Sequence, residues 1–160
     1  MQQPEHLFGD ARPFAACHAS TLAQLADGSI VVAWFGGTAE KDPDTAIWFA
    51  HHSASGWTAP RQVAKVAPQA HWNPVLLVAP DTTLWLWFKV GVDPMQWSTW
   101  FMSSADGGQS WSAARELVPG DAGGRGPVKN KPIVLSDGTW LAPASRELPD
   151  RWYVFVDRSE

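Results

Sequence analysis

Residues 104–111 read Ser-Ala-Asp-Gly-Gly-Gln-Ser-Trp. This stretch predicts a tight turn between two β-strands. Asp106 can accept hydrogen bonds from N–H groups of its own turn, and Gly107 or Gly108 can adopt a positive φ at little cost. Trp111 then begins the next strand with a large apolar ring system that can pack against a neighbour. A single turn of this kind occurs in many folds. It indicates a particular fold only if strand–turn–strand units recur along the chain.

The rest of the chain does repeat, at a nearly constant spacing. Three segments share the order strand, turn at an aspartate, strand: residues 18–35, 71–88 and 129–143. The turn aspartates are Asp27, Asp81 and Asp137, and the differences between their positions are 81 − 27 = 54 and 137 − 81 = 56. A period of roughly 50 residues made of four short strands is typical of one blade of a β-propeller.

The repeat therefore predicts an all-β fold, a partial β-propeller of about three four-stranded antiparallel blades. The blades are expected at roughly residues 14–64, 71–118 and 128–160, the last one cut short, within a single domain, 1–160. Three blades leave two open sheet edges, and unpaired edges favour pairing with another chain. Self-association through these edges is accordingly a further expectation.

Composition limits the classes of function. The chain has 160 residues, 45% hydrophobic and 18% charged, which suits one domain with a packed core. A net charge of −4 gives no electrostatic footprint for nucleic acid or for an anionic membrane. The single cysteine, Cys17, excludes an internal disulfide. The N-terminal sequence has no signal-peptide pattern, so we expect a cytoplasmic protein, or a secreted one if a leader is missing.

One end of the predicted blades carries most of the polar chemistry. Alternate turns of an antiparallel meander fall on opposite ends of the sheet, so the aspartate turns and the 104–111 turn share one end, which we expect to be structural. The first strands of a propeller line its central axis. Five residues at the other end should therefore approach one central pocket: His18, His71, Asn73, Asn130 and Lys131.

These motifs resemble the Asp-box, or BNR, repeats of the sialidase superfamily, and more narrowly the bacterial predicted neuraminidase-like proteins. The resemblance is carried by Cys17-His-Ala-Ser-Thr, Trp34-Phe-Gly-Gly-Thr38, His71-Trp-Asn-Pro74 and Gly126-Pro-Val-Lys-Asn-Lys-Pro132, besides the 104–111 box. It implies a sialidase-type propeller of about six blades. It also implies a glycoside hydrolase acting on a terminal sugar, with acidic sugars among the candidates, for which three blades are an incomplete enzyme.

The resemblance also implies roles for individual residues. Classical sialidases hold the substrate carboxylate with an arginine at the start of a first-blade strand, where this chain has His18. The cations that could replace this arginine are Lys89, Lys131 and Arg146. The acid/base aspartate of sialidases lies in the loop after the second strand. Asp44 is our first choice for that role and Glu40 the second, since a closed pocket can raise the pKa of a general acid.

Further contacts with the sugar are expected from residues near the axis. Glu147 is a candidate second carboxylate, and Trp72 is a candidate platform for a sugar ring. His18 and His71 stand at the same blade position, one period apart, and with Asn73 they could bind hydroxyl groups. No cysteine or carboxylate stands at a zinc-like spacing, so neither a metal nor another cofactor is expected, and the expected partner is a carbohydrate.

Two other functions fit the same residues. One is a propeller-type polysaccharide lyase in which His18 or His71 abstracts the proton. The other is a non-catalytic carbohydrate-binding propeller, in which the tryptophans serve binding or packing.

Overall fold

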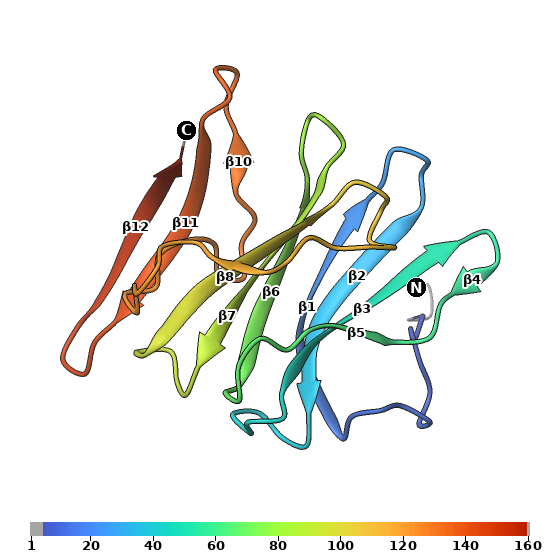
Figure 1. Ribbon diagram of the computed structural model, residues 1–160, viewed down its shortest axis with the longest axis horizontal. Helices are drawn as coiled ribbons and strands as arrows, with labels where there is room; N and C mark the ends of the chain where they lie inside the picture. The colour runs from blue at the N-terminus through green and yellow to red at the C-terminus, as the bar shows by residue number, and fades with distance from the viewer. Residues whose placement is uncertain (1–4, 160) are drawn as a thin grey trace.

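Residues 5–159 are described by the computed structural model, and they form three antiparallel sheets side by side with no helix among them (Figure 1). The first sheet holds β1 (Ala16–Gln24), β2 (Ile30–Gly37), β3 (Ala46–Ser53), β4 (Gly56–Trp57) and β5 (Arg61–Ala64). The second holds β6 (His71–Val78), β7 (Leu84–Gly91), β8 (Trp97–Ser104) and β9 (Arg115–Glu116). The third holds β10 (Ile133–Val134), β11 (Trp140–Glu147) and β12 (Trp152–Ser159).

Each sheet is a meander in which consecutive strands pair. The orders are β1-β2-β3-β4 with β5 also on β3, then β6-β7-β8-β9, then β10-β11-β12. In the first sheet the outer strand is split, because β4 and β5 pair with successive parts of β3. This is the blade arrangement of a β-propeller, so the all-β partial propeller predicted from the repeat is confirmed.

The three aspartate turns have one geometry, and they lie together at the top of Figure 1. In each turn the carboxylate accepts a hydrogen bond from the N–H two residues later, at 2.9, 3.0 and 2.9 Å for Asp27, Asp81 and Asp137. The residue between donor and acceptor has a positive φ, which glycine supplies in two turns and Thr82 in the third. The loops that join β2 to β3, β7 to β8 and β11 to β12 lie at the bottom of the same view.

The 104–111 turn is held by its own side chains and by the neighbouring blade. Ser110 donates to Asp106 through its N–H at 2.9 Å and through its hydroxyl, and these bonds lower the pKa of Asp106 to about 2. Gly107 and Gly108 both have positive φ. Trp111 packs edge-on against Phe49 of β3, with ring centroids 5.6 Å apart. The turn therefore joins the second blade to the first.

The main core lies between the first two blades. Alternate residues of β2 point to opposite faces, so Val31, Ala33 and Phe35 are buried against the second blade. The other face of β2 is covered by the N-terminal segment, where Phe14 packs on Trp34 at 6.0 Å. The third blade is less covered, and its β12 exposes 90% of Val154.

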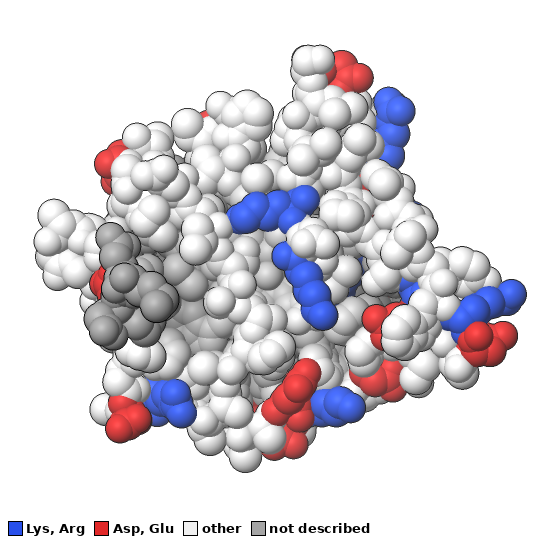
Figure 2. All heavy atoms as spheres, turned by 180° about the vertical axis from the view of Figure 1, so that it is seen from behind, with Lys and Arg blue, Asp and Glu red and all other residues white. Residues whose placement is uncertain are grey.

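The surface gives two simple observations. On the face drawn in Figure 2, charged side chains lie singly or in small groups on a mostly uncharged surface. Within residues 5–159 we find no helix that is long and apolar enough to cross a bilayer.

Candidate functional site

A cleft of about 750 Å³ opens among the three blades, at the end opposite the aspartate turns. Residues from all three blades line it. They are His18, Glu40, Trp72, Asn73, Pro94, Trp97, Val128, Lys129, Asn130, Pro143, Ala144, Ser145, Glu147, Val154, Phe155 and Val156. Six of the eleven residues predicted to form the site belong to this set: His18, Glu40, Trp72, Asn73, Asn130 and Glu147.

A positive φ recurs at the same position of each blade, near the residues that line this cleft. Ala19, Asn73 and Lys129 have φ values of 54°, 40° and 61°, and they follow one another at the same two intervals as the aspartate turns. In the first two blades the strand pairing slips at these positions, between His18 and Thr21 and between Trp72 and Val75. A positive φ costs a residue other than glycine about 1–2 kcal/mol. Strain of this kind is concentrated at functional sites, and two of the three strained residues, Asn73 and Lys129, line the cleft.

The pairing corrects the predicted equivalence of His18 and His71. His18 pairs with Phe35 of β2, and one repeat later Trp72 pairs with Lys89 of β7. The equivalent of His18 is therefore Trp72, and His71 stands one position too early in its strand. A displacement of one residue turns a strand side chain to the opposite face of the sheet.

His71 consequently lies in the core and not in the cleft. Its side chain is completely buried and stacks on Phe88 at 5.7 Å. Its Nε2 accepts the N–H of Val66 at 2.9 Å, so Nδ1 carries the proton and donates to the carbonyl oxygen of Gln69, also at 2.9 Å. Burial lowers the pKa of His71 to about 4. The predicted role in binding sugar or abstracting a proton is wrong for His71, since neither ring nitrogen is available.

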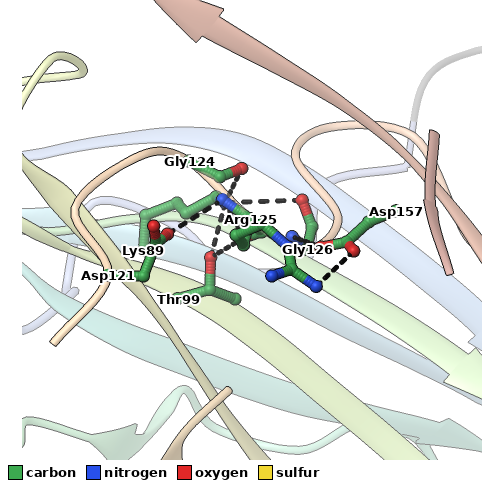
Figure 3. A network of polar contacts seen from close by, with 7 residues as sticks. All are labelled: Lys89, Thr99, Asp121, Gly124, Arg125, Gly126 and Asp157. Carbon is green, nitrogen blue, oxygen red and sulfur yellow. Dashed lines mark hydrogen bonds and ion pairs between the residues drawn. The ribbon is translucent and has the colours of Figure 1, made fainter. Parts of the chain in front are cut away.

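Lys89 is also turned away from the cleft, into a polar network between the second and third blades (Figure 3). Its Nζ donates to Thr99 Oγ1 at 2.5 Å and to the carbonyl oxygens of Gly124, Arg125 and Gly126 at 3.2, 2.9 and 3.4 Å. Arg125 itself is paired with Asp157 on β12 at 2.7 Å.

The network explains why Lys89 cannot serve as a substrate cation. Burial lowers the pKa of Lys89 to about 7, against the opposing effects of Asp121 and Asp157. Its amine holds the loop that joins the two blades, and its side chain is completely buried. The sequence-based assignment of Lys89 to substrate binding is therefore corrected.

The other two candidate cations are engaged or located elsewhere. Lys131 Nζ donates to the carbonyl oxygens of Leu22 and Leu76, at 2.6 and 2.5 Å, so it ties the third blade to β1 and β6. Arg146 lines a separate hollow beside Asp121 and outside the cleft. Neither residue lies where the sequence placed it, on the wall of the central pocket.

The two candidate acids of the β2–β3 loop have different surroundings. Asp44 closes the loop on itself: its Oδ2 accepts the N–H and the hydroxyl of Thr38 at 3.0 and 2.8 Å, and it is not among the lining residues. Glu40 lines the cleft and a smaller hollow that it shares with His18. The structure thus favours Glu40 over Asp44, the reverse of the order predicted.

The polar and aromatic lining residues differ in what they can offer a ligand. Trp72 is 3% exposed, donates to the carbonyl oxygen of Gly91 at 2.9 Å and packs on Trp97 at 6.2 Å, so it forms a wall rather than an open platform. Asn73 is 8% exposed, and its amide makes no hydrogen bond with any residue of the described chain. That amide is therefore free to bind a ligand in the cleft.

Ten of the sixteen lining residues were not among the predicted site residues, and two of them, Lys129 and Trp97, offer a charge and an aromatic ring to the cleft. Lys129 has the third positive φ and is exposed, and its position one repeat after Asn73 could have identified it. Trp97 begins β8, but the residue one period earlier is Pro43, so no repeat signal marked it.

A second cleft, of about 700 Å³, lies at the end with the turns, between the first two blades. Its polar groups hold the fold together. Ser29 donates to Asp27 at 2.6 Å and contacts His51 Nε2 at 3.0 Å, and Arg61 donates to the carbonyl oxygen of Gly108. This end has the structural character expected from the sequence.

No three His, Cys, Asp or Glu side chains of residues 5–159 are grouped so that they could hold a metal ion. What the central cleft does contain is a pair of carboxylates from different blades, Glu40 and Glu147, together with His18 and Lys129. Two carboxyl groups on either side of a bound molecule can divide the roles of proton donor and of base or nucleophile.

The chain matches one family of known proteins and shares its fold with several solved structures. The BNR repeat-like domain family matches residues 28–160. No curated protein sequence matches the chain significantly. A Hadza microbial sialidase shares the fold at a TM-score of 0.72 and 16% identity, over 91% of this chain and 35% of that one.

Two other solved structures are similar. A family 117 glycoside hydrolase of Zobellia galactanivorans has a TM-score of 0.67 at 13% identity, over 95% of this chain and 54% of that one. The α-L-arabinanase of Penicillium chrysogenum, complexed with arabinobiose, has a TM-score of 0.59 at 16% identity, over 92% and 47%. The chain thus spans between about a third and just over half of these structures, and at such identities the likeness shows the fold alone.

Proposed function

This chain belongs to the BNR repeat-like domain family, and from that premise we propose that it forms the substrate-binding part of a propeller glycoside hydrolase, a sialidase-like exo-glycosidase that removes a terminal sugar. The observation that carries the proposal is the pair Glu40 and Glu147, which line one cleft from the first and third blades. Sialidase, arabinanase and family 117 hydrolase folds among the similar structures support the reaction class.

In the proposed reaction Glu40 is the general acid. It would protonate the oxygen of the leaving group while the glycosidic bond breaks. Glu147 would act on the other side of the sugar, either activating a water molecule or attacking the anomeric carbon itself. Asp44 is a poorer acid candidate because its carboxylate already accepts two hydrogen bonds from Thr38.

Substrate contacts follow from the same cleft. His18 is exposed beside Glu40, and Asn73 and Asn130 carry amides that can both donate to and accept from sugar hydroxyls. The buried rings of Trp72 and Trp97 provide an apolar wall.

The test is a comparison of carboxylate variants on a panel of aryl glycosides. We expect Glu40→Gln and Glu147→Gln each to lower kcat at least about 100-fold, since acid–base catalysis contributes about 10²–10⁴-fold. Sugar binding should persist in both variants. Asp150→Asn is the matched control, because Asp150 is an exposed carboxylate on the β11–β12 loop and does not line the cleft. Wild-type turnover in the Glu40 variant or in the Glu147 variant would contradict the proposal.

A further inference from the structure

We propose that the sugar bound in the central cleft is uncharged, so that the substrate is a neutral glycoside rather than a uronic or sialic acid. The inference rests on the proposed function and adds the class of substrate to it. The sequence offered three cations, Lys89, Lys131 and Arg146, for binding an acidic sugar. The inference follows from where the structure places these side chains.

A sugar carboxylate requires a cation fixed at the site, most effectively a guanidinium that binds both oxygens. The three residues of this chain predicted to supply one are committed elsewhere. Lys89 donates to a hydroxyl and three carbonyl oxygens, and Lys131 to two carbonyl oxygens of the innermost strands. Arg146 lines a different hollow. No arginine of the described residues lines the cleft.

The charge that remains in the cleft is unfavourable for an anion. Of the described residues that line it, Lys129 carries one positive charge, while Glu40 and Glu147 carry two negative charges. The formal sum is 1 − 2 = −1 with His18 neutral, or 1 − 1 = 0 when Glu40 carries the proton of the proposed general acid, so the cleft has no net positive charge in either state. An acidic sugar would bring a further carboxylate among these groups, and like charges that share a cleft repel one another.

The rest of the lining suits hydroxyl groups. Asn73, Asn130 and Ser145 are uncharged and can each donate and accept hydrogen bonds, as sugar hydroxyls do. Asn73 is the most informative of them, because it is nearly buried, lies on a strained backbone position and has no hydrogen-bond partner within residues 5–159. A sugar hydroxyl that reaches this amide gains hydrogen bonds without displacing any protein group from it.

The experiment measures binding of matched sugar pairs by saturation-transfer NMR and calorimetry at pH 7 and low salt. The probes are the methyl glycosides of glucose, galactose and mannose, each compared with its uronate, together with methyl L-arabinofuranoside and N-acetylneuraminic acid. Each hexose–uronate pair differs only in a CH₂OH or a carboxylate at one carbon. We expect at least one neutral sugar to bind, each uronate to bind at least tenfold more weakly than its hexose, and N-acetylneuraminic acid to bind at least tenfold more weakly than the neutral sugar that binds best.

Variants separate the role of charge from that of shape. Glu147→Gln should strengthen uronate binding, so that the ratio of the Kd of a uronate to the Kd of its hexose falls by about threefold or more. Arg146→Gln, next to it on β11 but outside the cleft, should leave the ratio unchanged.

The outcomes also separate this inference from the proposed function. Binding of a neutral sugar without hydrolysis would support the inference and overturn the catalytic proposal. Hydrolysis or preferred binding of an acidic sugar would overturn the inference and leave the catalytic proposal standing. A chain that bound none of the probes would overturn both.

Discussion

His71 should make the stability of the chain depend on pH between 7 and 5. The imidazole is completely buried and neutral, with a proton on Nδ1 and a hydrogen bond accepted by Nε2. Burial lowers its pKa in the folded chain to about 4, from an ordinary value of 6.5. As the pH falls below 6.5, the unfolded chain takes up a proton that the folded chain does not. The free energy of unfolding must therefore decrease with falling pH in this window.

The size of the effect follows from the two pKa values. The whole difference is worth about 3 kcal/mol, at about 1.4 kcal/mol for each tenfold change in proton affinity. Between pH 7 and pH 5 most of this is lost, about 2 kcal/mol, because the folded imidazole begins to bind its proton only near pH 4. Lys89, with a pKa of about 7, affects stability mainly above this window, since below pH 7 it is protonated in both states.

The assay is urea unfolding followed by tryptophan fluorescence at pH 7, 6 and 5. The variant is His71→Gln, which has no group that titrates here. It should be less stable than the wild type at pH 7 and should lose most of the dependence on pH. His18→Gln is the matched control, because His18 is exposed, and it should keep the wild-type slope. An equal slope in the wild type and the His71 variant would refute the argument, and so would an NMR titration that gave His71 a pKa of 6 or more.

Three further predictions concern the turns. Gly108→Ala should cost about 3 kcal/mol in urea unfolding and Gly28→Ala about 1 kcal/mol. Both positions have φ near +90°, but only at Gly108 would the added Cβ overlap an aromatic ring, and equal costs would contradict this reading. Thr82→Gly should raise stability by about 0.5 kcal/mol, because a β-branched residue there has a φ of 70°; a lower melting temperature would count against it. Hydrogen bonds within their turns lower the pKa of Asp27 and Asp137 below 3.8 and that of Asp106 to about 2, so the contribution of these three residues is present above about pH 4 and lost on acidification towards pH 2. Asp106→Asn should weaken that acid dependence in a series of melts from pH 5 to pH 2.

The sequence alone determined the blades, because the signals that define them are local. An aspartate that bonds to the N–H two residues later, beside a residue with positive φ, requires only a few consecutive residues. Repetition of that unit at two nearly equal intervals then located each pair of strands. The separation of a structural end from a polar end followed from the alternation of turns along a meander.

Only the tertiary structure decided which of the eleven predicted side chains line the cleft and which five do not. His71 stands one position before Trp72, the equivalent of His18 in the strand pairing, so its side chain turns to the opposite face of the sheet and into the core. Lys89 is directed by carbonyl oxygens of a loop far along the chain, in contacts that exist only once two blades have packed. The period of 54 residues does map His18 onto Trp72, since 18 + 54 = 72, but it does not say which face of its strand His71 occupies. That face and the partners of Lys89 depend on packing between segments distant in the sequence, not on neighbouring residues.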